Sequence, residues 1–249
     1  MQEADTRTSI RPIAMLIDGD NAQPSLIKNV MTEAGKYGLV TIRRIYGDWT
    51  TDNMKQWKDT LHVHAIQPIQ QFRYTTGKNA TDSAMIIDTM DILYEGVVNG
   101  FCLVSSDSDY TRLATRIREK GFFVMGIGRN QTPRAFVNAC EVFVYTENLQ
   151  AEPAASRARK RSKPAPAAKQ TQTEPLPVLK SAFEMAVQDD GWAFLGTVGS
   201  RLRQLDPSFD PRTYGHKQLS LLIRDLEAFE VREVKSPNGP SSIFVRPTE

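Results

Sequence analysis

The stretch IAMLIDGDNA (13–22) places an apolar run, residues 13–17, directly before an acidic turn that holds Asp18, Asp20 and Asn21. A continuous apolar run of this length is typical of a β-strand buried on both faces. Such strands belong to parallel sheets whose two faces are covered by helices. The stretch therefore predicts an α/β domain with carboxylates at the carboxyl end of its first strand.

Strand-like and helix-like segments alternate through the rest of this domain. We expect further strands at 39–46, 65–72, 101–105, 122–127 and 142–145. We expect helices from Pro24 to near Gly35 or Gly38, at 52–61, at 80–94, around 113–117 and at 133–139. This alternation predicts a doubly wound, mostly parallel sheet with helices on both faces.

Acidic residues occur where such a sheet binds its ligands, beyond the carboxyl ends of its strands at the switch point. Asp18 follows the first strand, and Asp107 and Asp109 follow the strand at 101–105. Asp82 lies in the first turn of the helix at 80–94. A single Asp at such a place also serves as a helix cap or turn former. Because all four fall on segments that converge, we predict one acidic pocket.

Clustered carboxylates favour a bound divalent cation, because their repulsion raises their pKa values until a positive charge compensates. Ligand sets made only of oxygen suit Mg²⁺ or Mn²⁺. Such an ion activates a water and neutralises charge on a phosphate oxygen. We predict Asp18 and Asp107 as direct ligands, with Asp82 and Asp109 ligating directly or through water. The four acids are the predicted catalytic residues.

Polar residues beside the acids are candidates for substrate contacts: Asn21, Lys78, Asn79 and Ser106. Lys78 offers a point charge to a phosphate, although an exposed loop lysine is equally expected. Asn79 and Ser106 stand where helix N-termini need caps or bind phosphate. Asn21 is expected to orient a ligand or hold a phosphate oxygen.

Composition limits the class of protein. The chain has 249 residues with 40% hydrophobic and 24% charged residues, which is ordinary globular usage, and a net charge of +2 identifies no partner. Its two cysteines exclude a disulfide scaffold and fit a reducing compartment. No apolar run approaches the ~18 residues of a membrane span, and residues 1–12 lack the apolar core of a secretory signal, so we expect none. We expect a cytoplasmic protein.

Without a G-x-x-x-x-G-K-[ST] or G-x-G-x-x-G motif, we expect no nucleotide cofactor.

The composition changes at residues 149–175, which are rich in Ala, Pro and basic residues. Residues 151–175 contain no Val, Ile, Leu or aromatic residue and cannot form a core, so we predict a linker between domains at 11–148 and 176–247. The basic run is either a solvated tether or an additional nucleic-acid contact. Beyond it, helices at 179–187, 195–205 and 218–229 and a hairpin built on the 236–239 turn predict a winged helix.

Residues 13–146 resemble an NYN domain, a LabA-like branch of the PIN-like ribonuclease superfamily. The matching pieces are IAMLIDGDNA (13–22), RRIYGDW (43–49), GKNATDSAMIIDTMDILY (77–94) and LVSSDSDYTRLATRIREKG (103–121). The resemblance implies a PIN-like, Rossmann-like fold and metal-dependent RNA hydrolysis. By position it points to Asp18, Asn21, Asp82, Asp107 and Asp109. Two departures are mild: Ser106 where Gly is often found, and Tyr110 where Phe is common.

Residues 176–247 resemble a LOTUS domain, also called OST-HTH, a winged-helix module associated with RNA. The resemblance implies RNA binding or, in some members, protein partnering. Arg212, His216 and Lys217, together with Arg224, lie around the expected recognition helix and are the candidates for phosphate contact.

The leading hypothesis is a metal-dependent ribonuclease, expected to be an endonuclease, whose C-terminal module recruits RNA. The alternative is a non-catalytic RNA-binding adaptor. A third is a phosphatase of the haloacid-dehalogenase type, because Asp18-Gly19-Asp20 resembles its Asp-x-Asp pair, but Ala22 stands where that family has Thr. PIN-like domains often pair, so the resemblance also makes a homodimer an expectation.

Overall fold

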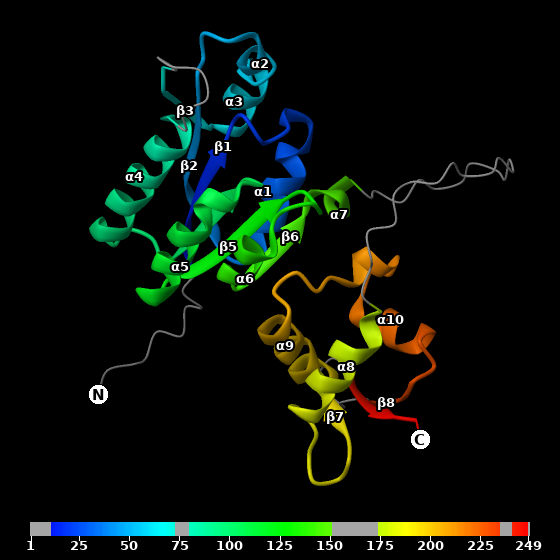
Figure 1. The fold of residues 1–249 in the computed structure, drawn as a ribbon. Coiled ribbons are helices and arrows are strands. Elements are labelled where there is room, and N and C mark those ends of the chain that lie inside the picture. Colours follow the sequence, from blue (N-terminus) through cyan, green and yellow to red (C-terminus); the bar gives the residue numbers. More distant parts are fainter. Residues whose placement is uncertain (1–10, 73–79, 151–173, 235–240, 249) are drawn as a thin grey trace, which may run out of the picture. The chain divides into compact units, whose positions relative to one another are not determined.

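The computed structural model describes residues 11–72, 80–150, 174–234 and 241–248 (Figure 1). The chain divides into two compact units, residues 1–150 and 151–249. Each unit has its own buried apolar core, and each is described by itself below.

The first unit contains a six-stranded sheet in the order β3-β2-β1-β4-β5-β6. Its strands are β1 (Pro12–Asp18), β2 (Leu39–Gly47), β3 (Gln67–Gln70), β4 (Gly100–Val104), β5 (Phe123–Gly128) and β6 (Val142–Tyr145). Every neighbouring pair is parallel. The predicted fold class, a doubly wound and mostly parallel α/β sheet, is confirmed. Because strand order changes direction between β1 and β4, the switch point lies between these strands.

Helices cover both faces of this sheet. They are α1 (Ile27–Gly35), α2 (Asp52–Lys55), α3 (Lys58–His64), α4 (Ala80–Glu95), α5 (Thr111–Glu119), α6 (Arg134–Ala139) and α7 (Thr146–Gln150). Ile13, Met15 and Ile17 of β1 pack in one core with residues of α1, α2 and α7. Ala14 and Leu16 pack in a second core with residues of α4, α5 and α6. Since strand residues alternate between faces, burial on both faces explains the unbroken apolar run of β1.

Two predicted elements near β3 are wrong in extent. The helix expected at 52–61 is two helices, because the chain turns at Gln56 and Trp57 and buries the Trp57 indole in the core. The strand expected at 65–72 begins only at Gln67, because Ala65 has a left-handed conformation (φ 50°) that ends α3. Pro68 is accommodated because β3 is an edge strand of the sheet.

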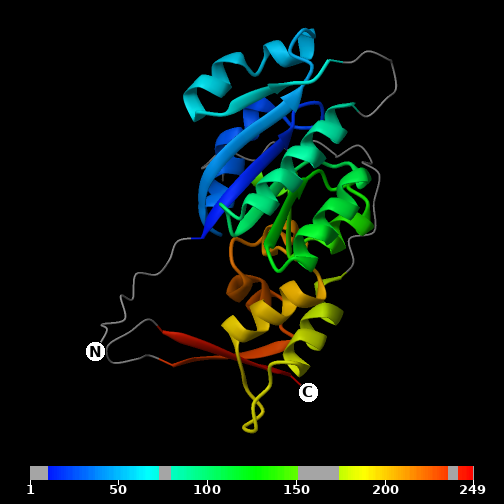
Figure 2. The same cartoon turned by 90° about the vertical axis from the view of Figure 1, so that its left-hand side faces the viewer.

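The second unit combines helices with an antiparallel sheet of order β7-β9-β8. Its elements are α8 (Pro175–Glu184), β7 (Ala193–Phe194), α9 (Leu195–Leu205), α10 (Leu219–Asp225), β8 (Phe229–Val234) and β9 (Ser242–Pro247). In Figure 2 the long strands β8 and β9, orange to red, run along one side of the unit's helices. The predicted 236–239 turn lies outside the described residues. The helix expected at 218–229 ends at Asp225, since Phe229 already belongs to β8.

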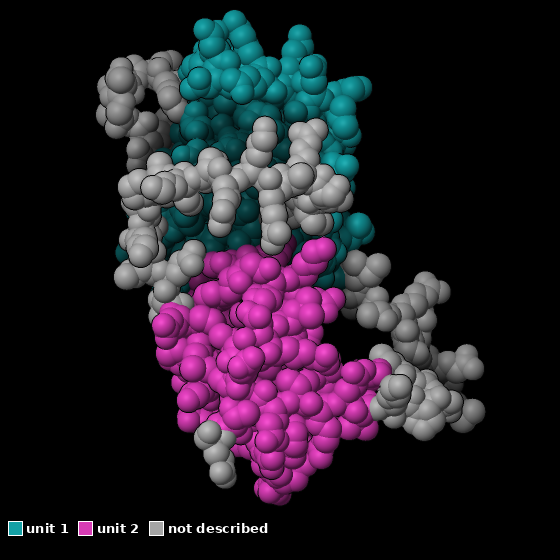
Figure 3. All heavy atoms as spheres, turned by 90° about the vertical axis from the view of Figure 1, so that its right-hand side faces the viewer, with its two compact units in different colours: residues 1–150 teal, residues 151–249 magenta. Residues whose placement is uncertain are grey.

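Figure 3 colours the two units separately, teal for residues 1–150 and magenta for 151–249. The predicted linker falls mostly on residues 151–173, which lie outside the described part of the chain. Among the described residues, no helix is both long and apolar enough to cross a bilayer.

Candidate functional site

Three of the four predicted acids meet at the carboxyl edge of the sheet. Asp82 lies in the first turn of α4, and Asp107 and Asp109 lie in the loop that follows β4. One carboxylate oxygen from each lies within 4.8 Å of the others. Asp82 and Asp107 are half-buried, and Asp109 is exposed. Asp82 lies 25 and 27 positions before Asp107 and Asp109 in the sequence, and the parallel fold brings it beside them.

Asp18 stands at the end of β1 beside this group, and its side chain is engaged by hydrogen bonds. It is 1% exposed. Its Oδ2 accepts bonds from Asn21 Nδ2 (2.6 Å) and Ser105 Oγ (2.9 Å), and its Oδ1 accepts one from the backbone N–H of Asp20 (3.1 Å). Asp18 is not part of the three-carboxylate group, so its direct ligation of a metal stays a prediction. Asn21, predicted to orient a ligand, orients Asp18.

Burial and mutual repulsion act on these carboxylates. Burial raises the pKa of Asp18, the hydrogen bonds from Asn21 and Ser105 oppose the rise, and the charge of Asp82 adds to it. Burial also raises the pKa of Asp82, against its hydrogen bond from Tyr110, and the charges of Asp107 and Asp109 raise it further. The site therefore concentrates negative charge where water compensates it poorly.

Ser105 connects the two central strands and was not predicted as a functional residue. Its hydroxyl donates to Asp18, and it accepts a 3.1 Å bond from the backbone N–H of Asp107. Asp107 Oδ1 in turn accepts from the backbone N–H of Asp109 at 2.9 Å, which caps the 3-10 turn Ser108–Tyr110. Ser105 thus fixes Asp18 relative to the Asp107 loop. The sequence feature that could have identified Ser105 is its position as a polar residue directly after a fully buried strand.

Gly19 allows the chain to turn sharply between Asp18 and Asp20. Its backbone N–H donates a 2.9 Å hydrogen bond to the carbonyl oxygen of Tyr46 on β2. A Cβ at this position would lie 2.7 Å from that oxygen and 2.6 Å from Cε of Met54. Only glycine permits so close an approach of the two backbones.

A small pocket lies at the carboxyl ends of β4 and β5, against α1 and the turn after β1. Its cavity volume is about 20 Å³, its polar lining includes Asn21, Ser106, Arg129 and Thr146, and none of the three clustered acids lines it. Ser106 Oγ accepts a 2.8 Å hydrogen bond from the backbone N–H of Arg129, which joins the loops after β4 and β5. Ser106 does not cap the 3-10 turn, because Asp107 does, but it does line this pocket.

Thr81 adds a buried polar atom next to Asp82. The residue is 4% exposed, and its hydroxyl has no hydrogen-bond partner among the described residues. Lys78 and Asn79, predicted as substrate contacts, lie outside the described residues.

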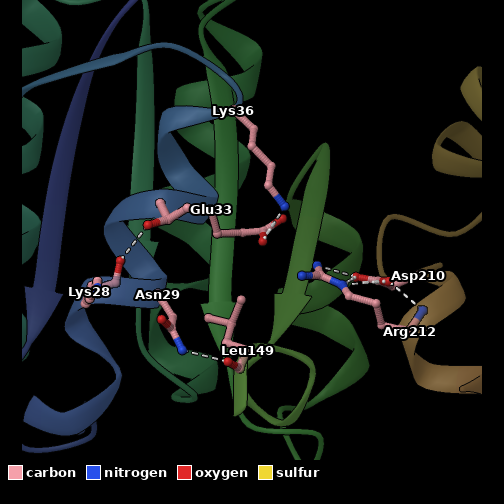
Figure 4. A network of polar contacts seen from close by, with 8 residues as sticks. Lys28, Asn29, Glu33, Lys36, Leu149, Asp210 and Arg212 are labelled. Carbon is pink, nitrogen blue, oxygen red and sulfur yellow. Dashed lines mark hydrogen bonds and ion pairs between the residues drawn. The ribbon is translucent and has the colours of Figure 1, made fainter. Parts of the chain in front are cut away.

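Two of the residues predicted to contact RNA in the second unit, Arg212 and His216, lie beside acidic side chains. Arg212 forms several bonds with Asp210, including Nη2 to Oδ2 at 2.6 Å. Figure 4 shows this pair; within the first unit it also shows the bond from Asn29 Nδ2 to the Leu149 carbonyl (2.7 Å), which joins α1 to α7. His216 Nε2 lies 3.4 Å from Asp225 Oδ2, and Lys217 is exposed.

Comparisons with known proteins match both units. The model of the NYN domain family matches residues 12–148, and the model of the OST-HTH/LOTUS domain matches residues 167–240. Among solved structures, a protein of unknown function from Vibrio parahaemolyticus is 18% identical, covering 58% of this chain and 96% of its own, with a TM-score of 0.47. An uncharacterized protein from Nitrosomonas europaea is 33% identical over 37% of this chain and 93% of its own, with a TM-score of 0.29. No curated protein matches the chain.

Proposed function

We propose, from the premise that this chain belongs to the NYN domain family, that it is a metal-dependent ribonuclease that cleaves RNA endonucleolytically. The NYN family is of the nuclease type, and the chain also carries an OST-HTH/LOTUS domain, a module that binds RNA. The observation that carries the proposal is the group of Asp82, Asp107 and Asp109, whose oxygens lie within 4.8 Å of one another.

The residues at the site suit a Mg²⁺ or Mn²⁺ ion. Hard divalent cations take oxygen ligands, and three carboxylates supply them. The Thr81 hydroxyl is buried and without a partner among the described residues, which leaves an unused polar atom in the same turn of α4. Burial raises the pKa of Asp82, and the charges of Asp107 and Asp109 raise it further; a bound cation would compensate that negative charge. When bound, the ion supplies an activated water and neutralises charge on the phosphate.

The protein's own residues then have separable tasks. Asp82, Asp107 and Asp109 hold the ion, and Tyr110 orients Asp82 through a 2.7 Å hydrogen bond from its hydroxyl. Asp18, fixed by Asn21 and Ser105, adds negative charge beside the group. Ser106 and Arg129, which join the loops after β4 and β5 beside Asp107, are the polar groups available to the phosphate next to the scissile bond.

The second unit, in this proposal, raises the concentration of RNA near the acids. A module that holds the substrate on the same chain converts encounter into an intramolecular step, and the gain depends on linker length. Recruitment of this kind changes the apparent affinity for RNA more than the rate at saturation.

The burial of Asp18 disfavours the phosphatase alternative. A haloacid-dehalogenase-type nucleophile must present a carboxylate oxygen to an incoming phosphate. Both oxygens of Asp18 accept hydrogen bonds, and the residue is 1% exposed.

The proposal is tested with end-labelled single-stranded and structured RNAs incubated in Mg²⁺, Mn²⁺ or EDTA. We expect internal cleavage that requires the metal, with no phosphoenzyme formed. Metal-independent cleavage would contradict the metal site. Tight RNA binding without cleavage under any of these conditions would favour the adaptor.

A further inference from the structure

The outer face of the β7-β9-β8 sheet carries aromatic and arginine side chains. Register places Phe194 of β7 opposite Phe244 of β9, and Phe244 opposite Arg232 of β8. The next positions along these strands, Ala193 and Val245, are 0% exposed and belong to the core. Because side chains alternate between faces, Phe194, Phe244 and Arg232 share the face turned away from the core.

These side chains contact one another in a continuous layer. The Arg232 guanidinium lies 4.4 Å from the ring centre of Trp192 and 5.6 Å from that of Phe244. The Arg246 guanidinium lies 4.9 Å from the Trp192 ring centre. The rings of Phe194 and Phe244 are 5.8 Å apart. We call Trp192, Phe194, Arg232, Phe244 and Arg246 the aromatic–arginine face.

The face remains accessible. Phe194 is 39% exposed, and the side chains of Arg232 and Arg246 are each 47% exposed. Arg232 lies 3.7 Å from Asp190, and Arg246 lies 2.6 Å from Glu230. Exposed ion pairs of this kind contribute little stability, so either acid is readily exchanged for a phosphate.

We propose that the aromatic–arginine face binds single-stranded RNA by stacking unpaired bases on its rings and guanidinium planes. The proposal rests on the proposed function and names the surface through which the second unit recruits its substrate. Bases of single strands stack on aromatic side chains and on arginine planes, with phosphates held by neighbouring cations. Bases within a duplex are already stacked and do not offer a free face, so single strands are the form that fits.

The expected recognition helix is less suited to this task. Arg212 is held by Asp210 in a pair whose side chains are only 27% and 12% exposed, whereas the ion pairs of Arg232 and Arg246 are exposed. Its exposed apolar residue, Leu221 (46%), has no aromatic ring to offer a base. The sheet face therefore combines stacking surfaces with cations, and α10 does not.

The test measures binding by fluorescence anisotropy in the full chain carrying Asp107→Asn, so that RNA stays intact. Probes are a labelled single-stranded RNA and the same RNA annealed to its complement. We expect Trp192→Ala and Arg232→Ala each to weaken single-strand binding about tenfold, and Trp192→Phe to retain most of it. Lys180→Ala, an exposed cation on α8, is the matched control and should bind as the parent does.

Tryptophan fluorescence gives an independent readout. The chain has three tryptophans. Stacking of a base on Trp192 should quench its share of the fluorescence, and this quenching should be absent in Trp192→Phe. Circular dichroism verifies that each variant is folded. If Trp192→Ala does not fold, Arg232→Ala alone tests the aromatic–arginine face.

The outcomes separate this inference from the proposed function. Undiminished single-strand affinity in both Trp192→Ala and Arg232→Ala, with a loss in Lys217→Ala instead, would overturn the face as the RNA surface while leaving RNA recruitment intact. Equal, undiminished affinity in all variants would likewise overturn the inference. A parent chain that binds no RNA would refute the recruitment role itself.

Discussion

The hydroxyl of Tyr110 donates a 2.7 Å hydrogen bond to Oδ1 of Asp82, joining the loop after β4 to the first turn of α4. The Tyr110 side chain is fully buried, so the bond is held in place by packing. It opposes the burial and the neighbouring charges that raise the pKa of Asp82. The contact therefore both positions a candidate metal ligand and favours its ionised form.

Replacing Tyr110 with Phe tests this relationship without removing the buried ring. Loss of the donor should raise the pKa of Asp82 further, because the hydrogen bond lowers it. A metal ligand must be deprotonated, so the acid limb of the pH–rate profile should move to higher pH, with activity at alkaline pH retained. The measurement is kcat/KM for RNA cleavage against pH. An unshifted acid limb would mean that Asp82 does not control activity.

Asp18→Asn should change the pH dependence of stability. The folded-state pKa of Asp18 is raised above its ordinary value of 3.8. Its protonation therefore stabilises the wild-type fold fully below that value, and this contribution is lost as pH rises through the folded-state pKa. Asparagine does not titrate, so the stability of the variant relative to wild type should improve as pH rises from 3.8 through the raised folded-state pKa of Asp18. Urea unfolding at several pH values measures this, and a pH-independent difference would contradict it.

Gly19→Ala should destabilise the first unit by about 1–3 kcal/mol, because its Cβ would overlap the Tyr46 carbonyl oxygen and Met54. Gly35→Ala is the matched control: it ends α1, and a Cβ there meets nothing within 4 Å. Alanine in place of a helical glycine should stabilise by about 0.5–1 kcal/mol. Thermal unfolding of both variants measures the difference. Equal stabilities would show that the turn at Gly19 tolerates a side chain.

Deleting residues 175–249 should raise KM for RNA more than it lowers kcat. The first unit has its own core and contains all four predicted acids. Losing the RNA-binding module removes local substrate concentration but not the chemistry. Steady-state kinetics on a single-stranded RNA distinguish the two parameters. An unchanged KM would remove the recruitment role from the second unit.

The sheet and its acidic edge were predictable because they depend on local patterns. The unbroken apolar run in β1 requires burial on both faces, and parallel strands place their carboxyl ends at one edge. Asp82, Asp107 and Asp109 meet for that reason. The extent of α2 and α3 was not predictable in the same way, because the break at Trp57 serves tertiary packing.

The sequence patterns did not predict which side chains pair with one another in the fold. Arg212 was expected to contact phosphate, but the turn at Pro211–Tyr214 brings it against Asp210. Ser105 was missed because its role depends on Asp18, 87 residues away, lying on the neighbouring strand. The aromatic–arginine face was missed because β7 is only two residues long, too short to show alternation.

The most direct test of the proposed ribonuclease activity compares RNA cleavage in Mn²⁺ by wild type, Asp107→Asn and Asp91→Asn. Asp107 belongs to the three-carboxylate group, whereas Asp91 is an exposed acid on α4 outside it. We predict that Asp107→Asn loses at least about a hundredfold in kcat, as expected for removal of a group that stabilises the transition state, while RNA affinity and fold are retained. Asp91→Asn should cleave as wild type does. Cleavage by Asp107→Asn at the wild-type rate would contradict the account.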